Sequence, residues 1–194
     1  MTIRRAAIFL LLTSFIVLSP DANAQSRKGF EVGIGFGSFS LSSDQISDTK
    51  GGGVFGIAYG FSERFTLGVD GIGAEIDEPD ADDGKATAGI GTLYGRLYFG
   101  SSSARTRGYA LFGLGGGEYS YDDDGVTIKG SGPAGMLGAG LDHMFGNSFA
   151  IFGEVRFHGV KIDSISAGGL VIENGFDYDA GVTTVMVGAR VRIR

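Results

Sequence analysis

Very few residues in this chain have the types and spacing that catalysis requires. It contains no cysteine and only two histidines, so no thiolate nucleophile or thiolate metal site is available. Only His158 lies in a plausible enzyme context, because it shares the predicted inner face with Glu154 and could act with it in general acid-base chemistry. A Ser-His-acid hydrolase also needs a hydroxyl within hydrogen-bond reach of the base, and we find no motif that supplies one. His143 fits an interfacial position better than a ligand position, so the sequence predicts no enzyme, no cofactor and no catalytic residue.

Eight charged residues are candidates for a different kind of site. Each lies in an apolar segment and alternates with bulky apolar neighbours. They are Glu31, Asp70, Arg96, Asp142, Glu154, Arg156, Arg190 and Arg192. Such a set could form an acid-base centre, but unpaired buried charges are energetically expensive. We therefore predict a structural network that pairs these charges, and the sequence leaves open which acid meets which base.

The first residues predict export. Arg4 and Arg5 precede an apolar run over residues 6–18, and Ala22 and Ala24 supply small residues at a cleavage site. These are the features of a secretory signal peptide. The apolar run is shorter than the roughly 20 residues that a transmembrane helix needs. We expect a signal peptide over 1–24, cleavage after Ala24, and one mature domain over 25–194.

Glycine is the anomaly in the composition. The chain holds 36 glycines and only three prolines, without a collagen-like repeat. A narrow barrel explains this content, because an eight-stranded lumen has room only for a mixture of large and very small side chains. The absence of cysteine excludes disulfides. The net charge of −6 argues against nucleic acid as a partner.

The strongest pattern is an alternation of apolar residues with small or charged ones. It recurs in eight segments, around residues 30–37, 55–61, 65–70, 92–99, 109–121, 137–145, 149–158 and 185–194. No later segment is apolar enough for a transmembrane helix, so a membrane span must be a closed barrel. An arginine facing lipid at midplane would cost about 2–4 kcal/mol. The sequence thus predicts an all-β fold, an eight-stranded antiparallel up-and-down transmembrane β-barrel with its charges in the lumen.

The connections between these segments alternate in length. Compact turns are predicted at residues 62–64 and 146–148, with a longer one at 100–108. Long polar stretches are predicted as external loops, at residues 42–52, 75–87, 120–131 and 159–179. Aromatic residues of the apolar face stand beside the short turns: Phe30, Phe61, Phe65, Phe99, Phe145 and Phe149. We expect them to form an aromatic girdle at the periplasmic interface.

Two of the predicted loops are acidic. One holds a cluster of carboxylates before Gly84, namely Asp77, Glu78, Asp80, Asp82 and Asp83, and the other holds Asp122, Asp123 and Asp124. Clustered carboxylates suit calcium, but the spacing fails the EF-hand pattern and no bidentate glutamate ends it. We predict no metal site. The expected role is a hydrated surface that shares divalent cations with lipopolysaccharide.

Three segments carry a resemblance to a known family: the Tyr- and Gly-rich Tyr109–Gly115, the acidic-x-Arg-aromatic Glu154–Phe157, and the last strand Val187–Arg194. Over residues 28–194 the chain resembles the outer-membrane β-barrel family typified by the N-terminal domain of outer membrane protein A and by small surface antigens. The resemblance implies insertion into the Gram-negative outer membrane by the barrel-assembly machinery, which recognises the last strand. Arg194 departs from the family's terminal Phe, and Ile193 stands at the parity of that aromatic. We expect a monomer.

Three functions are open at this point. The first is a non-enzymatic barrel with a plugged lumen, in contact with outer-membrane lipid and lipopolysaccharide, whose loops serve envelope structure or bind host or envelope surface ligands. The second is a small porin-like channel for solutes. The third is a soluble periplasmic barrel that holds an apolar ligand, as lipocalins do, which would need the opposite assignment of faces. Lipid A deacylases resemble this barrel in size but carry a serine where this chain has Val160.

Overall fold

The computed structural model describes residues 27–42, 47–76, 85–123, 126–168 and 170–193. The predicted signal peptide over 1–24, with Ala22 and Ala24, lies outside the described residues. The acidic cluster over 77–84 and Asp124 lie outside them as well. None of the described residues forms a helix long and apolar enough to cross a membrane.

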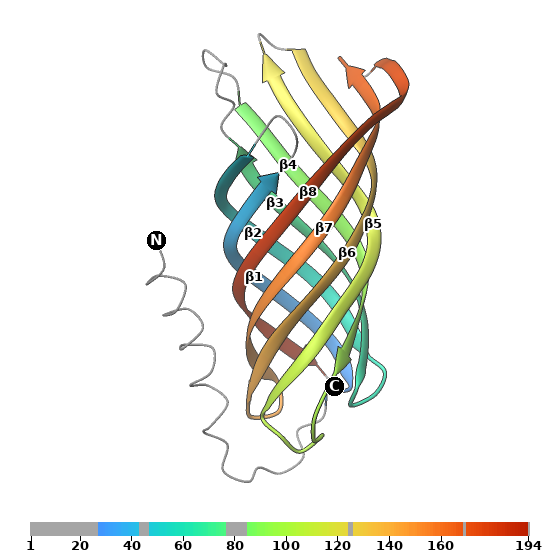
Figure 1. The fold of residues 1–194 in the computed structure, drawn as a ribbon. Coiled ribbons are helices and arrows are strands. Elements are labelled where there is room, and N and C mark those ends of the chain that lie inside the picture. Colours follow the sequence, from blue (N-terminus) through green and yellow to red (C-terminus); the bar gives the residue numbers. More distant parts are fainter. Residues whose placement is uncertain (1–26, 43–46, 77–84, 124–125, 169, 194) are drawn as a thin grey trace.

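Eight antiparallel strands form one closed barrel, as predicted (Figure 1). The strands are β1 (Gly29–Ser42), β2 (Ser47–Gly60), β3 (Phe65–Ile76), β4 (Lys85–Tyr98), β5 (Thr106–Asp123), β6 (Val126–Phe145), β7 (Phe149–Ala167) and β8 (Leu170–Ile193). Each strand pairs with the next along the chain, and β1 pairs with β8 from Phe30↔Ile193 to Ser42↔Gly181. We call the end where residues 61–64, 99–105 and 146–148 join the strands the turn end, and the opposite end the hairpin end.

The alternation in the sequence decides which side chains face the lumen. On β5, Tyr109 and Leu111 are each 1 % exposed, whereas Phe112 and Leu114 lie on the outer surface. The same division holds around the wall, because residues directly opposite each other in neighbouring strands share a face. A slip of one residue would exchange the two faces of a strand, so burial of the charges also determines the register. The predicted fold class is therefore correct.

Glycines make room in the lumen for large side chains. A Cβ atom at Gly188 would lie 2.3 Å from the carbonyl oxygen of Ile34 and 2.5 Å from the ring of Phe152. A Cβ atom at Gly140 would lie 2.5 Å from the ring of Tyr109. Both rings are buried. These contacts give the glycine-rich composition a steric cause, because the inward rings of Phe152 and Tyr109 need neighbours without a side chain.

The prediction of long external loops is wrong for most of the residues concerned. Residues 159–167 and 170–179 belong to β7 and β8, and residues 120–123 and 126–131 belong to β5 and β6. The error has a physical cause. Beyond the bilayer the outer face of a strand meets water, so a polar stretch there can continue the ladder of backbone hydrogen bonds. Polarity alone therefore does not end a strand at the membrane surface.

We predict that Gly188→Ala lowers the free energy of unfolding by about 1–3 kcal/mol, because the added methyl group overpacks the lumen against Phe152. Gly71→Ala is the matched control, since nothing lies within 4 Å of a Cβ atom at Gly71. Its effect should stay within about 0.5 kcal/mol. Urea titrations of both variants in detergent micelles measure the difference. Equal stability of the two variants would contradict the steric role of Gly188.

Candidate functional site in the barrel lumen

All eight charged residues that the sequence singled out lie inside the barrel, and none is more than 8 % exposed. They come from six strands: Glu31 on β1, Asp70 on β3, Arg96 on β4, Asp142 on β6, Glu154 and Arg156 on β7, and Arg190 and Arg192 on β8. Each stands at an inward position of its strand. The closed wall therefore concentrates charges that are far apart in the sequence.

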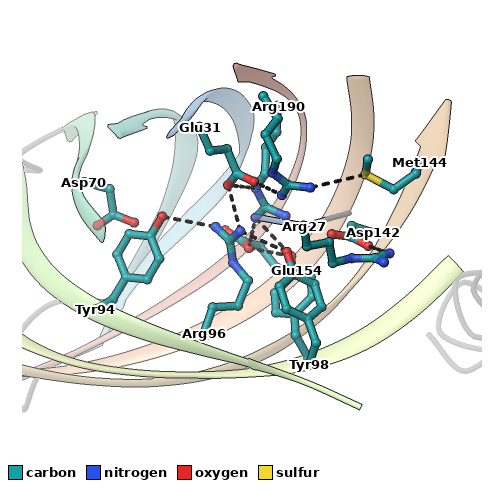
Figure 2. A network of polar contacts seen from close by, with 12 residues as sticks. Arg27, Glu31, Asp70, Tyr94, Arg96, Tyr98, Asp142, Met144, Glu154 and Arg190 are labelled. Atoms are coloured by element: carbon teal, nitrogen blue, oxygen red, sulfur yellow. Dashed lines mark hydrogen bonds and ion pairs between the residues drawn. The ribbon is translucent and has the colours of Figure 1, made fainter. Parts of the chain in front are cut away.

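Glu31 is one centre of the ion pairs. Its carboxylate lies 2.7 Å from Nη1 of Arg96 and 3.6 Å from Nε of Arg190, and it also pairs with Arg192. Figure 2 shows Arg96 and Arg190 reaching this carboxylate from different strands. One acid thus holds three arginines, and it links β1 with β4 and β8.

Glu154 is the second centre, and it completes a continuous network. Its two oxygens lie 2.6 Å from Nη2 of Arg156 and 2.8 Å from Nη2 of Arg190. Arg156 also reaches across the lumen to Asp70, with an N–O distance of 2.6 Å. Arg190 contacts both Glu154 and Glu31. Side chains from β1, β3, β4, β7 and β8 are therefore joined in one chain of ion pairs.

Asp142 belongs to a separate pair whose partner the sequence did not indicate. Its Oδ1 lies 2.9 Å from Nη2 of Arg27, which precedes β1. Arg107 is also buried near this end, and it donates hydrogen bonds to the carbonyl oxygens of Glu63 at 2.6 Å and Phe99 at 3.1 Å. Arg27 and Arg107 thus close the turn end of the lumen. Arg27 has the parity of Glu31, and this signal could have identified it.

Tyrosine hydroxyls complete the hydrogen bonding of the network. Nη1 and Nη2 of Arg96 donate to the hydroxyls of Tyr98 and Tyr94, each at 3.1 Å. Tyr109 donates its hydroxyl proton to Glu154 at 2.8 Å and accepts from Arg190 at 3.1 Å. Tyr94 and Tyr98 have the parity of Arg96 in the sequence, but this alternation alone did not indicate that they belong to the network. Arginine donors outnumber carboxylate acceptors, so phenol oxygens and rings are needed beside them.

The hairpin-end half of the lumen is apolar, which differs from the predicted filling by glycines and ionic partners. A buried cluster there contains Phe39, Val54, Ile72, Ile90, Ala134, Val160, Val182 and Met186. Within the ionic half, a cavity of about 20 Å³ is lined by residues that include Asp70, Arg96 and Arg190. That volume is close to the space of one water molecule. The lumen therefore has two fillings in series, one ionic and one apolar.

His158 and Glu154, which the sequence offered as the one conceivable acid-base combination, do not pair. Both carboxylate oxygens of Glu154 are occupied by Tyr109, Arg156 and Arg190. His158 is 3 % exposed, stands opposite Met136 and Val182 in the neighbouring strands, and has no hydrogen-bond partner for either ring nitrogen among the described residues. The carboxylate is therefore committed to arginines, and the imidazole lacks the acid that would orient it as a base.

The family of this barrel follows from a match to a known domain. The sequence model of the outer membrane protein beta-barrel domain matches residues 7–190. The chain belongs to this outer membrane barrel family. It accordingly lies in the outer membrane of a Gram-negative cell. No curated protein sequence matches the chain.

Solved structures of outer membrane barrels share the fold at low sequence identity. Neisserial surface protein A is similar over 85 % of this chain and 97 % of its own, with 15 % identity and a TM-score of 0.67. Ail, the attachment invasion locus protein of Yersinia pestis, solved with the heparin analogue sucrose octasulfate, is similar over 86 % and 99 %, with 19 % identity and a TM-score of 0.57. The N-terminal barrel domain of OprF from Pseudomonas aeruginosa is similar over 86 % and 99 %, with 14 % identity and a TM-score of 0.51.

The outer surface of this outer membrane barrel is apolar around the whole wall. Phe36, Leu114 and Leu137 are 69 %, 75 % and 67 % exposed. In water such a surface would be an aggregation site, whereas acyl chains cover it in a bilayer. A soluble lipocalin-like barrel needs a polar exterior, so that alternative is not supported.

Six phenylalanines surround the turn end of the outer membrane barrel. Phe30, Phe61, Phe99, Phe145 and Phe149 are exposed on the outer surface, and Phe65 is half-buried. Ring centroids are 6.4 Å apart for Phe61 and Phe65 and 6.0 Å apart for Phe145 and Phe149. His143 lies against Phe145, with centroids 4.7 Å apart. These positions are those expected for the aromatic girdle, whose place at the periplasmic interface stays a prediction.

We predict that Glu154→Gln destabilises the folded barrel by about 3–5 kcal/mol, because two buried guanidinium groups lose a shared charge. The matched control is Glu118→Gln, since Glu118 pairs with Lys129 at 3.0 Å on the exposed surface. The control should change stability by at most about 1 kcal/mol. Urea-dependent unfolding of both variants in the same detergent gives the comparison. If the two variants lose equal stability, the buried network does not hold the wall together.

Proposed function

We propose that this outer membrane protein is a non-enzymatic barrel with a closed lumen, which serves envelope structure or surface interaction. The observation that carries the proposal is the pair of fillings in series. Asp70, Arg156, Glu154, Arg190 and Glu31 form a chain of ion pairs from wall to wall. The apolar cluster lies beyond it toward the hairpin end.

The two fillings oppose conduction for different reasons. An ion that entered the ionic half would have to replace arginine-carboxylate contacts already made at 2.6–2.8 Å. It would then meet an apolar section, where water and ions are excluded as in a hydrophobic gate. The alternative, a small porin-like channel for solutes, would need gaps in both sections at once.

We further propose that the turn end faces the periplasm and the hairpin end faces the exterior. Short turns and longer extensions are arranged this way in outer membrane barrels. The apolar wall would contact outer-membrane lipid and lipopolysaccharide, and the last strand, Val187–Arg194, would be recognised by the barrel-assembly machinery. A single barrel with a closed wall needs no second copy, so we expect a monomer.

External ligands would be host or envelope surface molecules, and the acidic charge narrows their chemistry. The solved complex of Ail contains a heparin analogue. This chain has a net charge of −6, which disfavours polysulfated ligands and nucleic acid alike. A basic or neutral surface partner fits better.

The proposal that the chain is not an enzyme rests on the state of its histidines. His158 is buried next to apolar residues and has no described acid to orient it. Nδ1 of His143 lies 2.7 Å from Oγ1 of Thr106 at the turn end, but His143 stands beside the exposed phenylalanines rather than in a cavity. A catalytic site needs a nucleophile, a base and an orienting group in one pocket.

Planar-bilayer recordings test the closed lumen. The wild-type barrel should carry no steady current, and Arg96→Ala/Arg156→Ala should also stay closed, because the apolar cluster still excludes water. Adding Phe39→Ala and Val160→Ala to that variant should produce conductance. Heat-modifiable migration on gels shows whether each variant keeps its barrel. A large wild-type conductance would defeat the proposal, and a fully conducting double variant would show that the apolar section is no barrier.

A further inference from the structure

Part of β8 has a free sheet edge at the hairpin end. β8 begins at Leu170, but its pairing with β1 starts only at Gly181↔Ser42. Within residues 170–180, the pairing with β7 covers 170–171, 173–174 and 178–180, with register shifts between Ile162 and Ser164 and between Ile165 and Ser166. No described strand pairs with the other side of residues 170–180. Figure 1 shows the β7–β8 hairpin rising past the end of β1. The backbone N–H and C=O groups on this edge are available to another strand.

The extended hairpins are apolar on the face that continues the lumen. One residue from each of the strands β5 to β8 shows this. Tyr121 pairs with Ile128, Ile128 pairs with Ala167, and Ala167 pairs with Leu170, so the four side chains share a face. Ile128 is 42 % and Leu170 is 76 % exposed. Tyr121, with Tyr119 and Ile162 below it, packs against the buried apolar cluster. An exposed apolar surface thus runs into a buried one.

The opposite face of the same hairpins is polar. Glu118 of β5 and Lys129 of β6 pair at 3.0 Å on the outside, each about half exposed. Thr127 and Asp122 form a hydrogen bond farther along the same hairpin. The projecting sheet is therefore amphipathic, and its apolar face is turned toward the barrel axis. Folding of the barrel itself does not require this face to stay apolar where it is exposed.

We propose that residues 170–180 of β8 form a docking edge for an extended segment of another protein, which adds as a further strand and lays its apolar side chains on the exposed inner face. Strand addition obtains affinity from main-chain hydrogen bonds and specificity from alternate side chains. It uses the free edge and the apolar face together, whereas a small apolar ligand would use only the face. The inference deepens the surface-interaction role proposed above and rests on the hairpin end facing the exterior.

Charge defines the partner further. Residues 170–180 read Leu-Val-Ile-Glu-Asn-Gly-Phe-Asp-Tyr-Asp-Ala, with three acids and no base. Opposite charges on adjacent strands stabilise pairing, and like charges oppose it. The partner is therefore an extended segment in which apolar residues alternate with lysine or arginine. A second copy in the same membrane fits poorly, because a twofold axis along the membrane normal would bring two acidic edges together.

The test uses the mature chain in zwitterionic lipid nanodiscs and two fluorescent peptides of the same composition. One alternates lysine and valine over ten residues, and the other has five valines followed by five lysines. Anisotropy titrations against empty nanodiscs give the affinities. The alternating peptide should bind at least about tenfold more tightly than the block peptide, a difference of about 1.4 kcal/mol. It should also slow amide hydrogen exchange over residues 170–180.

Two shortened variants locate the binding. Replacing Ser164–Asn174 by Asn-Gly removes the outer part of the edge, and replacing Asp122–Thr127 by Asn-Gly shortens the neighbouring hairpin as the matched control. The first variant should lose at least about tenfold in affinity for the alternating peptide, and the control should keep it. Heat-modifiable migration verifies that both keep the barrel.

Three results would overturn the docking edge: equal affinity for the two peptides, binding that survives removal of Ser164–Asn174, or no binding up to about 1 mM peptide. Binding of dodecanoate with no binding of the alternating peptide would replace it with a site for a small apolar ligand. These outcomes are separate from the closed lumen, because a conducting wild-type barrel would defeat that proposal without changing the peptide result.

Discussion

Inside a bilayer, every backbone N–H and C=O must find its partner within the protein, because acyl chains offer none. In this chain the pairing of β1 with β8 meets that requirement by closing the sheet. Closure gives every inward side chain a place in one narrow lumen. The charged residues can then be buried only as partners of one another. Glycines are needed where the rings of Phe152 and Tyr109 would otherwise collide with a side chain of the neighbouring strand. The ionic network and the glycine content are consequences of the same closure.

The closed ladder also explains why the two ends of the molecule differ. At the turn end, short connections and the buried Arg27 and Arg107 seal the lumen. At the hairpin end, closure stops where β1 ends, while β8 is 24 residues long and continues past it. A strand needs only about 9–11 residues to cross the membrane. The excess length of β8 therefore carries an edge outward that the bilayer no longer protects and that no described strand covers.

Alternation made the fold and the charged inward residues predictable from the sequence. The period of two residues identifies the strands, and the energetic cost of a lipid-facing arginine decides which face of a strand points into the lumen. This reasoning put Glu154 and Arg190 on the inner face, where the structure has them. Their contact joins two different strands, and it depends on the stagger between the strands, which no local pattern in the sequence encodes. Arg27 precedes the first alternating segment, so only its parity with Glu31 could have identified it as an inward residue. The apolar filling around Phe39 and Val182 was missed because only glycines and charges were taken as inward signals. The loop boundaries were wrong because an outward polar residue, such as Lys129, can belong to a strand in water as well as to a loop.

Bulky apolar side chains of this barrel face acyl chains, while buried tyrosines and charges face the lumen. Because the chain contains no tryptophan, single replacements give clean signals. Phe112→Trp and Tyr94→Trp place probes on adjacent strands, since Gly95 pairs with Phe112 and Tyr94 pairs with Gly113. In liposomes with brominated acyl chains, the Phe112→Trp fluorescence should be strongly quenched and the Tyr94→Trp fluorescence should not. Quenching of both probes to the same extent, or of Tyr94→Trp alone, would contradict this assignment of the two faces.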